Sequence, residues 1–223
     1  MVAMEVIPDP EAAGQRAAEI VAELARRAIA DRGRFAWAIS GGGPPALIFR
    51  RLGALELPWH VIDTWQVDER VAPTGDPERN RSEQERSLPP EAGAGTRWMP
   101  VEDDDLEAAA ERYAATLPEW FDIIHMGIGA DGHTASLVPG DPVLDVHDRD
   151  VAVTDRYEGR RRMTLTYPGL SRARSVLWLV TGSEKREALR RLLRADRSIP
   201  AARVPVADQV VVTDASAARD EGP

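Results

Sequence analysis

The sequence predicts an α/β fold: a doubly wound, mostly parallel β-sheet with flanking helices, in a Rossmann-like arrangement. Segments with helical periodicity alternate with short apolar runs that are typical of buried strands. Several of these runs end in glycine-rich or charged segments, as strand-to-helix turns commonly do. A chain of 223 residues with 43% hydrophobic and 29% charged residues can bury one full core, so we expect a single domain over residues 1–223.

Two helix–strand pairs are expected in the first third of the chain. Residues 10–33 place Ala, Ile, Val and Leu at helical spacing, and Gly33 stands where a C-terminal cap belongs. Residues 34–40 ("RFAWAIS") are typical of a strand that runs into the turn "GGGPP". A short helix over 45–55, with proline in its first turn, and a second strand over 59–69 follow.

Residues 70–90 carry no periodicity and are rich in Pro, Arg and Glu, which predicts a long surface loop of the kind that is often functional. The glycine-rich turn "GIGADGH" is expected to lead from a strand into a helix. The remaining expected elements are a helix over 105–120, a buried strand over 121–130, strands over 161–170 and 175–182, a helix over 183–195, a last strand over 209–218 and a frayed tail over 219–223.

Composition narrows the classes of partner. The chain has 28 Lys and Arg against 37 Asp and Glu, a net charge of −9, so it would repel nucleic acid and anionic membranes. An anionic substrate would need a local cluster of basic side chains. The absence of cysteine excludes disulfides, thiolate catalysis and cysteine–zinc sites, and it agrees with a cytoplasmic location. No secretion signal is visible, and the longest apolar run, "SVLWLV", is too short to cross a bilayer.

Three segments are expected at the carboxyl ends of strands, where doubly wound sheets bind ligands. They are "SGGGPP", "VDER" and "GIGADGH". Gly41, Gly42 and Gly43 could cradle a phosphate with their amides at a helix N-terminus, or they could simply form a tight turn. Neither the G-x-G-x-x-G spacing nor the P-loop lysine is present, which disfavours dinucleotide and Walker-type binding.

Charged residues follow the second expected strand. Asp68 could be a general base or could orient one, and Arg70 could clamp a phosphate. Asp68, Glu69 and Arg70 could equally be an exposed charge run that caps the strand.

One histidine is set among small residues. His133 can exchange protons near neutral pH, and Asp131 is close enough in sequence to orient its ring. His60 and His125 are expected in strands and His147 in a polar loop, so we interpret these three as structural. No second histidine or carboxylate is spaced from His133 in the sequence as metal ligands usually are, so no metal is expected. Lys185 and Arg162 could donate to a phosphate or could be ordinary solvated cations.

Taken in order, five segments resemble those of 6-phosphogluconolactonases, in the glucosamine-6-phosphate isomerase/6-phosphogluconolactonase superfamily. They lie within residues 36–218 and read "AISGGGPPALIFRRL", "WQVDERVAPTGDPERNR", "FDIIHMGIGADGHTASLVPG", "RMTLTYPGLSRARSVLWLVTGSEKREAL" and "IPAARVPVADQVVVTDASAA". The "GADGHTASLVPG" segment is the most specific of them. The resemblance implies the NagB-type variant of the predicted fold.

The resemblance also implies an activity: hydrolysis of 6-phospho-D-glucono-1,5-lactone to 6-phospho-D-gluconate in the oxidative pentose phosphate pathway, without a cofactor or metal. His133 would be the general base, and backbone amides of the glycine-rich turns would stabilise the oxyanion. The implied catalytic residues are His133, Asp131 and Asp68; the implied substrate- and phosphate-binding residues are Ser40, Gly41, Gly42, Arg70, Gly129, Arg162 and Lys185, with Arg79 as a further candidate cation. The expected oligomeric state is a monomer or small homo-oligomer.

The chain departs from the family pattern at some positions. The usual turn Ser-Gly-Gly-Ser-Thr-Pro has Gly43 and Pro44 in place of its second serine and its threonine, and Pro44 has neither a hydroxyl nor an N–H to offer a phosphate. The family's Ser-Asn pair is Arg79-Asn80 here.

Two alternatives remain. Glucosamine-6-phosphate deaminases have a similar turn, "DGHIAFNEPG", whose glutamate corresponds to Val138 here, and they have Asp-Glu-Tyr where this chain has Asp-Glu-Arg. Both differences favour the lactonase. A non-catalytic sugar-phosphate-binding module would bind 6-phosphogluconate without hydrolysing the lactone.

Overall fold

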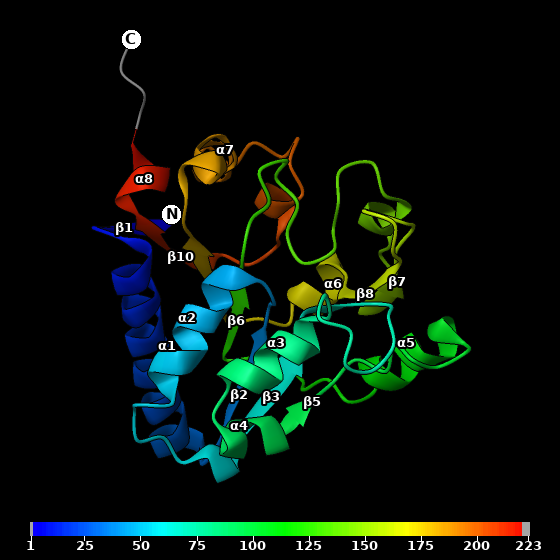
Figure 1. Cartoon of the computed structure of the whole chain (residues 1–223), viewed down its shortest axis with the longest axis horizontal. Helices are drawn as coiled ribbons and strands as arrows, with labels where there is room; N and C mark the ends of the chain where they lie inside the picture. The colour runs from blue at the N-terminus through cyan, green and yellow to red at the C-terminus, as the bar shows by residue number, and fades with distance from the viewer. Residues whose placement is uncertain (1, 220–223) are drawn as a thin grey trace.

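The computed structural model describes residues 2–219 and contains a seven-stranded sheet in the order β1-β10-β9-β6-β2-β3-β5 (Figure 1). All of its described strand pairs are parallel. In sheet order, the strands are β1 Ala3–Ile7, β10 Asp208–Asp214, β9 Ser175–Val180, β6 Ile123–Met126, β2 Phe35–Ile39, β3 Ile62–Gln66 and β5 Thr96–Arg97. The predicted doubly wound, mostly parallel sheet is confirmed.

Helices follow most of these strands. The α-helices are α1 Pro10–Arg32, α2 Gly43–Leu52, α3 Asn80–Ser87, α4 Pro90–Ala94, α5 Leu106–Ala114, α6 Tyr167–Leu170, α7 Arg186–Leu193 and α8 Ala215–Ala218. Short 3-10 helices lie at η1 Trp59–Val61, η2 Pro142–Asp145, η3 Ser183–Lys185 and η4 Ala201–Arg203. The long helix α1 begins after Asp9, whose side chain accepts a hydrogen bond from the amide of Ala12. It ends at Gly33, which has φ of 76° and forms the predicted C-terminal cap.

The large sheet separates two apolar cores, because the side chains of a strand alternate between its faces. In β2, Phe35, Trp37 and Ile39 pack with α1 and α2, whereas Ala36 and Ala38 belong to the core on the opposite face. Every residue of β2 is buried. This central strand therefore holds the turn at its carboxyl end in a fixed place.

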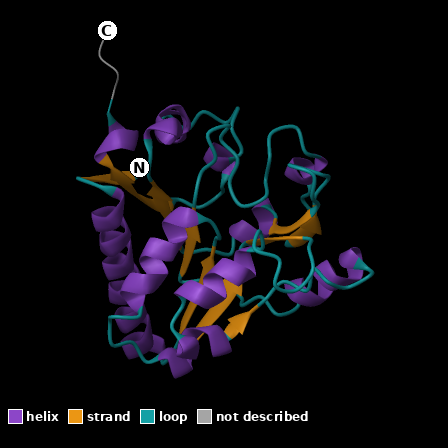
Figure 2. Ribbon diagram, viewed as in Figure 1, coloured by secondary structure: helices purple, strands orange, loops and turns teal. Residues whose placement is uncertain are grey.

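A second, three-stranded antiparallel sheet was not predicted. It consists of β4 Asp68–Arg70, β8 Arg162–Leu165 and β7 Val151–Val153, in that order, and Figure 2 shows β7 and β8 as a group of arrows apart from the large sheet. Its pairing sets Asp68 opposite Thr164 and Arg70 opposite Arg162. The small sheet therefore joins two chain segments that are about ninety residues apart in the sequence.

The expected surface loop over 70–90 was wrong in its second half, which contains α3. This helix, "NRSEQERS", has no apolar face, so periodicity could not reveal it. Its first-turn amides at Asn80 and Arg81 donate to the Glu69 carboxylate, which is a tertiary contact. The helix expected over 105–120 ends at Ala114, and β1 was not expected at all.

The helix expected directly after "GIGADGH" was also wrong. Residues 134–137 form a tight turn in which Thr134 pairs with Leu137 and Ala135 has φ of 50°. A left-handed alanine is strained, so tertiary contacts must hold this turn. The tail over 219–223 was expected to be frayed, but residues 220–223 lie outside the described part of the chain.

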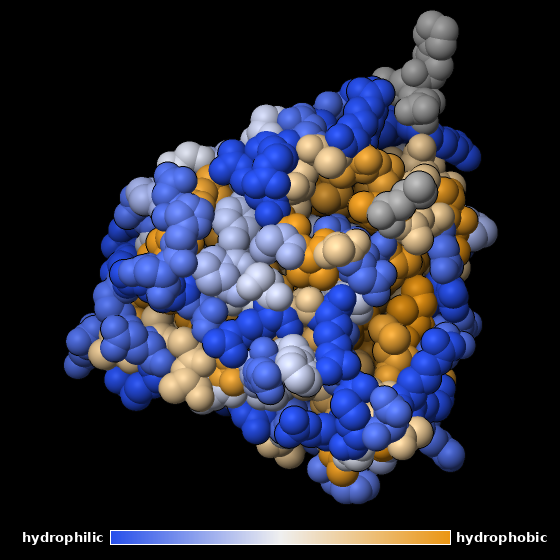
Figure 3. Space-filling model, turned by 180° about the vertical axis from the view of Figure 1, so that it is seen from behind, coloured by the Kyte–Doolittle hydropathy of each residue, from blue (hydrophilic) through white to orange (hydrophobic). Residues whose placement is uncertain are grey.

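Apolar side chains are exposed beside the edge strand β1. Met4 and Val6 of β1 are 44% and 51% exposed, and Leu193 of α7 is also exposed. Figure 3, the view from behind, shows apolar atoms gathered on this part of the molecule. None of these three residues is among the described residues that line the cavity below. Within residues 2–219, no helix is long and apolar enough to cross a membrane.

Candidate active site

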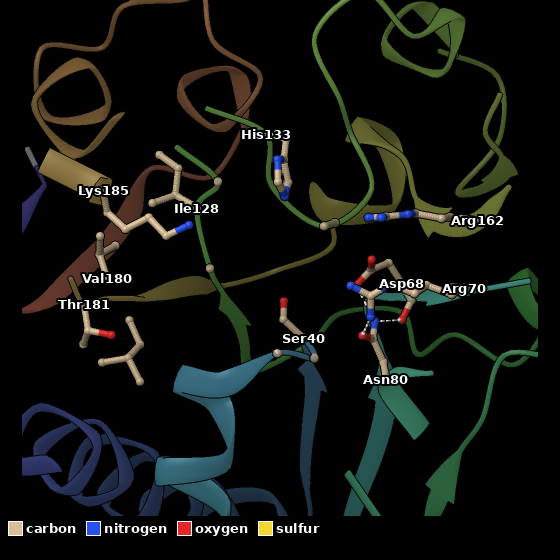
Figure 4. Close-up of a pocket in the computed structure, with 16 residues that line it drawn as sticks. Ser40, Asp68, Arg70, Asn80, Ile128, His133, Arg162, Val180, Thr181 and Lys185 are labelled. Carbon is tan, nitrogen blue, oxygen red and sulfur yellow. Dashed lines mark hydrogen bonds between the residues drawn. The ribbon is translucent and has the colours of Figure 1, made fainter. Parts of the chain in front are cut away.

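A cavity of about 260 Å³ opens at the carboxyl ends of β2, β6 and β9 (Figure 4). From β2 the chain passes to β3 and β5 on one side and returns to β6 on the other, so the cavity lies at the switch point of the sheet. Its described lining is Ser40, Gly41, Gly42, Asp68, Arg70, Asn80, Gly127, Ile128, Gly129, His133, Ala135, Arg162, Leu179, Val180, Thr181 and Lys185. Of the predicted site residues, Asp131 and the candidate cation Arg79 are not among the described residues that line the cavity, and the others are.

Asp131 stands behind the His133 ring. Its Oδ1 lies 2.6 Å from His133 Nδ1 and also accepts the His133 amide at 3.1 Å. With Nδ1 engaged, Nε2 is the ring nitrogen left for the cavity, toward which Figure 4 shows the ring pointing. Partial burial raises the pKa of Asp131, but the hydrogen bonds and charge of His133 outweigh burial and lower it overall. A carboxylate therefore orients the imidazole and would stabilise its protonated form.

Gly129 makes room for the histidine. A Cβ at this position would lie 2.1 Å from His133 Nδ1 and 2.5 Å from Asp131 Oδ1. Its amide donates to the carbonyl of His133 at 2.8 Å, within the same turn. Gly129 therefore allows the ring and carboxylate to pack closely, and its N–H is already used by the protein.

Asp68, from β4, is buried at 6% exposure and faces the cavity. Its Oδ2 accepts the Ser136 hydroxyl at 2.6 Å, and its Oδ1 accepts the side-chain amide of Asn80 at 3.2 Å. The strained turn at Ala135 thus places Ser136 on the carboxylate. Sequence reasoning did not single out Ser136, although it lies in the specific "GHTASL" segment.

Arg70 and Glu69 diverge from the same strand. Arg70 Nη1 donates to Asn80 Oδ1 at 2.9 Å and to the Glu78 carbonyl at 2.7 Å, which holds the guanidinium at the cavity wall. Glu69 is fully buried on the other side and accepts the amides of Arg70, Asn80 and Arg81. Its carboxylate is therefore structural: it fixes the start of α3.

The turn after β2 supplies the floor of the cavity. The Ser40 hydroxyl donates to the carbonyl of His125 at 3.0 Å, which ties β2 to β6. A Cβ on Gly41 would lie 2.2 Å from the Asn80 side chain, so only glycine fits there. Gly42 has φ of 101°, and its amide donates to Glu83 Oε2 at 3.2 Å. The side chains of residues 43–45, including Pro44, lie outside the described part of the structure.

Two cations reach the cavity from opposite sides, as Figure 4 shows for Lys185 and Arg162. Arg162 is 4% exposed and pairs with Glu158 at 2.9 Å, while its Nε has no hydrogen-bond partner among the described residues. Lys185 ends the 3-10 helix after β9 and forms no ion pair within residues 2–219. These donors are available to an anionic ligand.

Arg79, which the sequence suggested as a further candidate cation, does not line the cavity. It is 2% exposed and pairs with Glu102 and, at 3.5 Å, with Glu69. Its guanidinium group therefore already has two carboxylate partners.

The other histidines lie away from the described cavity lining. His125 is fully buried in β6, and burial lowers its pKa to about 3. His60 lies in a 3-10 helix rather than in the expected strand. Among the described residues, no group of three or more His, Asp or Glu side chains could hold a metal ion.

A family model and several 6-phosphogluconolactonases match most of this chain. The family model for glucosamine-6-phosphate isomerases/6-phosphogluconolactonase matches residues 8–213. A 6-phosphogluconolactonase of Synechocystis sp. is 35% identical over 78% of this chain and 78% of its own. One from Nostoc sp. is 32% identical over 83% and 82%, respectively.

Solved structures show the same fold. A 6-phosphogluconolactonase from Shewanella baltica superposes with a TM-score of 0.86 at 22% identity, covering 96% of this chain and 97% of that one. A monomeric glucosamine-6-phosphate deaminase of the NagB superfamily superposes with a TM-score of 0.84, also at 22% identity, covering 97% and 99%. The fold alone therefore does not separate the two activities.

Proposed function

Because the chain belongs to the glucosamine-6-phosphate isomerase/6-phosphogluconolactonase family, we propose that it hydrolyses 6-phosphogluconolactone to 6-phosphogluconate. The observation that carries the proposal is the Asp131–His133 pair at the mouth of a cavity with cations on opposite sides. The names of the relatives that are at least 30% identical support the same reaction.

His133 is the general base in this proposal. Nε2 takes a proton from a water molecule as the water oxygen attacks the lactone carbonyl carbon, and the carbonyl electron pair moves to its oxygen. When the tetrahedral intermediate collapses, the bond to the ring oxygen breaks, and protonated His133 returns the proton to that oxygen. Asp131 stabilises the imidazolium between the two steps, since its Oδ1 lies 2.6 Å from Nδ1.

The phosphate and the lactone carbonyl of the substrate are assigned to opposite ends of the cavity. Lys185, which forms no ion pair within residues 2–219, would hold the phosphate at the end of the cavity that lies after β9. Arg162 and Arg70, on the Asp68 side, would polarise the lactone carbonyl. The guanidinium groups would share the oxyanion role with backbone amides of the glycine-rich turns, of which those of Gly129 and Gly42 already have acceptors.

The deaminase reaction is the second candidate, since its fold is shared. Among the described residues that line the cavity, Asp68 is the one carboxylate. Val138 is buried at 6% exposure and is not part of that described lining. The place at which the deaminase turn has a glutamate is therefore apolar here, which favours the lactonase.

The test is turnover with three compounds: fresh 6-phosphogluconolactone, glucono-1,5-lactone without the phosphate, and glucosamine 6-phosphate. We expect fast hydrolysis of 6-phosphogluconolactone after subtraction of the spontaneous rate, and a much higher KM for glucono-1,5-lactone. We expect no release of ammonia from glucosamine 6-phosphate. Ammonia release would establish the deaminase instead. Binding of 6-phosphogluconate without any turnover would establish the non-catalytic module.

We also propose that the reaction belongs to the oxidative pentose phosphate pathway and takes place in the cytoplasm. The chain's lack of cysteine is compatible with that location. The partner would be a small anionic metabolite, which Arg70, Arg162 and Lys185 would bind in spite of the net charge of −9.

A further inference from the structure

Tyr157 contacts both members of the Asp131–His133 pair from outside the cavity lining. Its ring meets the His133 imidazole edge to face, with centroids 5.7 Å apart and planes at 62°. Its hydroxyl lies 3.5 Å from Asp131 Oδ2. Since His133 engages Oδ1, the two oxygens of Asp131 have different partners. Partial burial and the charge of Asp131 raise the pKa of Tyr157, so the hydroxyl keeps its proton and acts as the donor.

The ring of Tyr157 also contacts a cation of the cavity. The Arg162 guanidinium lies 4.9 Å from the centre of the tyrosine ring, and it pairs with Glu158 at 2.9 Å. Arg162 is 4% exposed and lines the cavity, so the ring and the carboxylate fix one of the groups assigned to the substrate. Tyr157 therefore contacts both the proposed base and the proposed carbonyl-binding cation.

A tight hairpin holds Tyr157 at this point. The amides and carbonyls of Tyr157 and Arg160 exchange hydrogen bonds of 3.0 and 3.2 Å. The two residues between them, Glu158 and Gly159, have φ of 50° and 82°, which are the angles of a type I′ turn. The same hairpin continues into β7 and β8 through Thr154 and Arg162. The tyrosine is thus carried by a short, laddered element and not by a long loop.

We propose that Tyr157 is a positioning residue for the lactonase reaction, holding the Asp131–His133 pair through its hydroxyl and ring and holding Arg162 through the ring face. This inference rests on the proposed function. It assigns two separable contributions: the hydroxyl acts on Asp131, and the ring acts on His133 and Arg162. The variants Tyr157→Phe and Tyr157→Ala separate them.

Steady-state kinetics with 6-phosphogluconolactone test the role. Tyr157→Phe should lower kcat about threefold with little change in KM, because one long hydrogen bond is lost. Tyr157→Ala should lower kcat by about tenfold or more and raise KM, because Arg162 loses the ring beneath it. As a control, Tyr167→Phe removes a tyrosine hydroxyl that donates to the Pro200 carbonyl at 3.1 Å, away from the described cavity lining, and should leave kcat unchanged.

The same substitutions of Tyr157 in an Asp131→Ala background show whether Tyr157 acts on the rate by positioning Asp131 or only by stabilising the fold. If the hydroxyl acts through Asp131, Tyr157→Phe has no further effect once the carboxylate is gone. An equal fold-loss in both backgrounds would mean that the hydroxyl does not act through Asp131, and it would overturn the proposal.

A readout without turnover separates this inference from the proposed function. The ¹⁵N and ¹H signals of the His133 ring, identified by their disappearance in His133→Ala, report its hydrogen bonding and the nearby aromatic ring. They should move in Tyr157→Phe and move further in Tyr157→Ala, even if the wild-type protein hydrolyses no lactone. Signals that are unchanged in both variants would show that Tyr157 does not contact the pair in solution and would overturn the inference.

Discussion

His133 Nδ1 lies 2.6 Å from Asp131 Oδ1, and the two residues are separated in sequence by Gly132 alone. The turn that contains them also hydrogen-bonds to itself, since the Gly129 amide donates to the His133 carbonyl. A five-residue turn thus holds a base and its orienting acid in one rigid unit. The proposed chemistry depends on this short distance more than on any other contact.

Removing the orienting acid should lower the rate more than the affinity. In Asp131→Ala the ring loses the partner that fixes its orientation and stabilises its protonated form. We expect kcat to fall by about 10- to 100-fold, with a change in KM of less than about threefold. Initial rates at several lactone concentrations, corrected for spontaneous hydrolysis, measure both. A KM effect alone would assign Asp131 to substrate binding.

A single methyl group at residue 129 should disable the same turn. In Gly129→Ala the new Cβ would meet His133 Nδ1 at 2.1 Å, so the ring must leave its position. We expect a loss of about 10²-fold in kcat with the fold retained, which circular dichroism and Tm check. Gly93→Ala is the matched control, because a Cβ there meets nothing within 4 Å. Full activity of Gly129→Ala would contradict the close packing.

The buried carboxylate after β3 should matter for stability. Glu69 is fully buried and accepts three backbone amides and the Gln66 side chain. Glu69→Gln turns one acceptor oxygen into a donor that faces other donors, so it should cost about 2–4 kcal/mol in the free energy of unfolding. Urea denaturation measures the loss. Glu85→Gln, which breaks only an exposed pair with Arg81, should cost less than about 0.5 kcal/mol.

His125 should make the protein sensitive to acid. Neither ring nitrogen has a hydrogen-bond partner among the described residues, and burial lowers the pKa of His125 to about 3. Below about pH 6.5 the His125 ring binds a proton in the unfolded chain but not in the folded chain. The free energy of unfolding therefore falls as the pH drops from about 6.5 toward about 3.

The variant His125→Leu removes both the orphaned nitrogens and this titration. We expect its free energy of unfolding at pH 7 to rise by about 1–2 kcal/mol, and its dependence on pH below about 6 to become shallower. Urea denaturation at a series of pH values measures both. An unchanged slope would mean that His125 does not bind a proton on unfolding in this range.

Local periodicity predicted five of the seven strands of the large sheet, because apolar patterns such as "RFAWAIS" and "SVLWLV" are strong; these are β2, β3, β6, β9 and β10. The short strands β1 and β5 were not predicted. Periodicity also missed α3, whose start is held by Glu69, and the turn at Ala135, which is held by contacts of Ser136 with Asp68 and Thr164. These elements depend on partners distant in sequence, which a local pattern does not contain.

Most candidate site residues were found because ligands bind at the ends of parallel strands, and the residues at those ends can be read from the sequence. Thr181, after β9, could have been found by the same rule. Arg79 was misplaced because its ion pairs with Glu69 and Glu102 have no local signature. Tyr157 could not be singled out, because its contacts with His133 and Asp131 join residues more than twenty positions apart in the sequence.

The most direct test of the account is the rate of 6-phosphogluconolactone hydrolysis by the wild-type protein and by His133→Ala, with freshly made lactone and the spontaneous rate subtracted. We expect fast turnover by the wild type and a loss of about 10²-fold or more in kcat for a folded His133→Ala protein. Wild-type turnover that survives the substitution would contradict the assignment of His133 as the base and would make Asp68, the carboxylate of the described cavity lining, the next candidate.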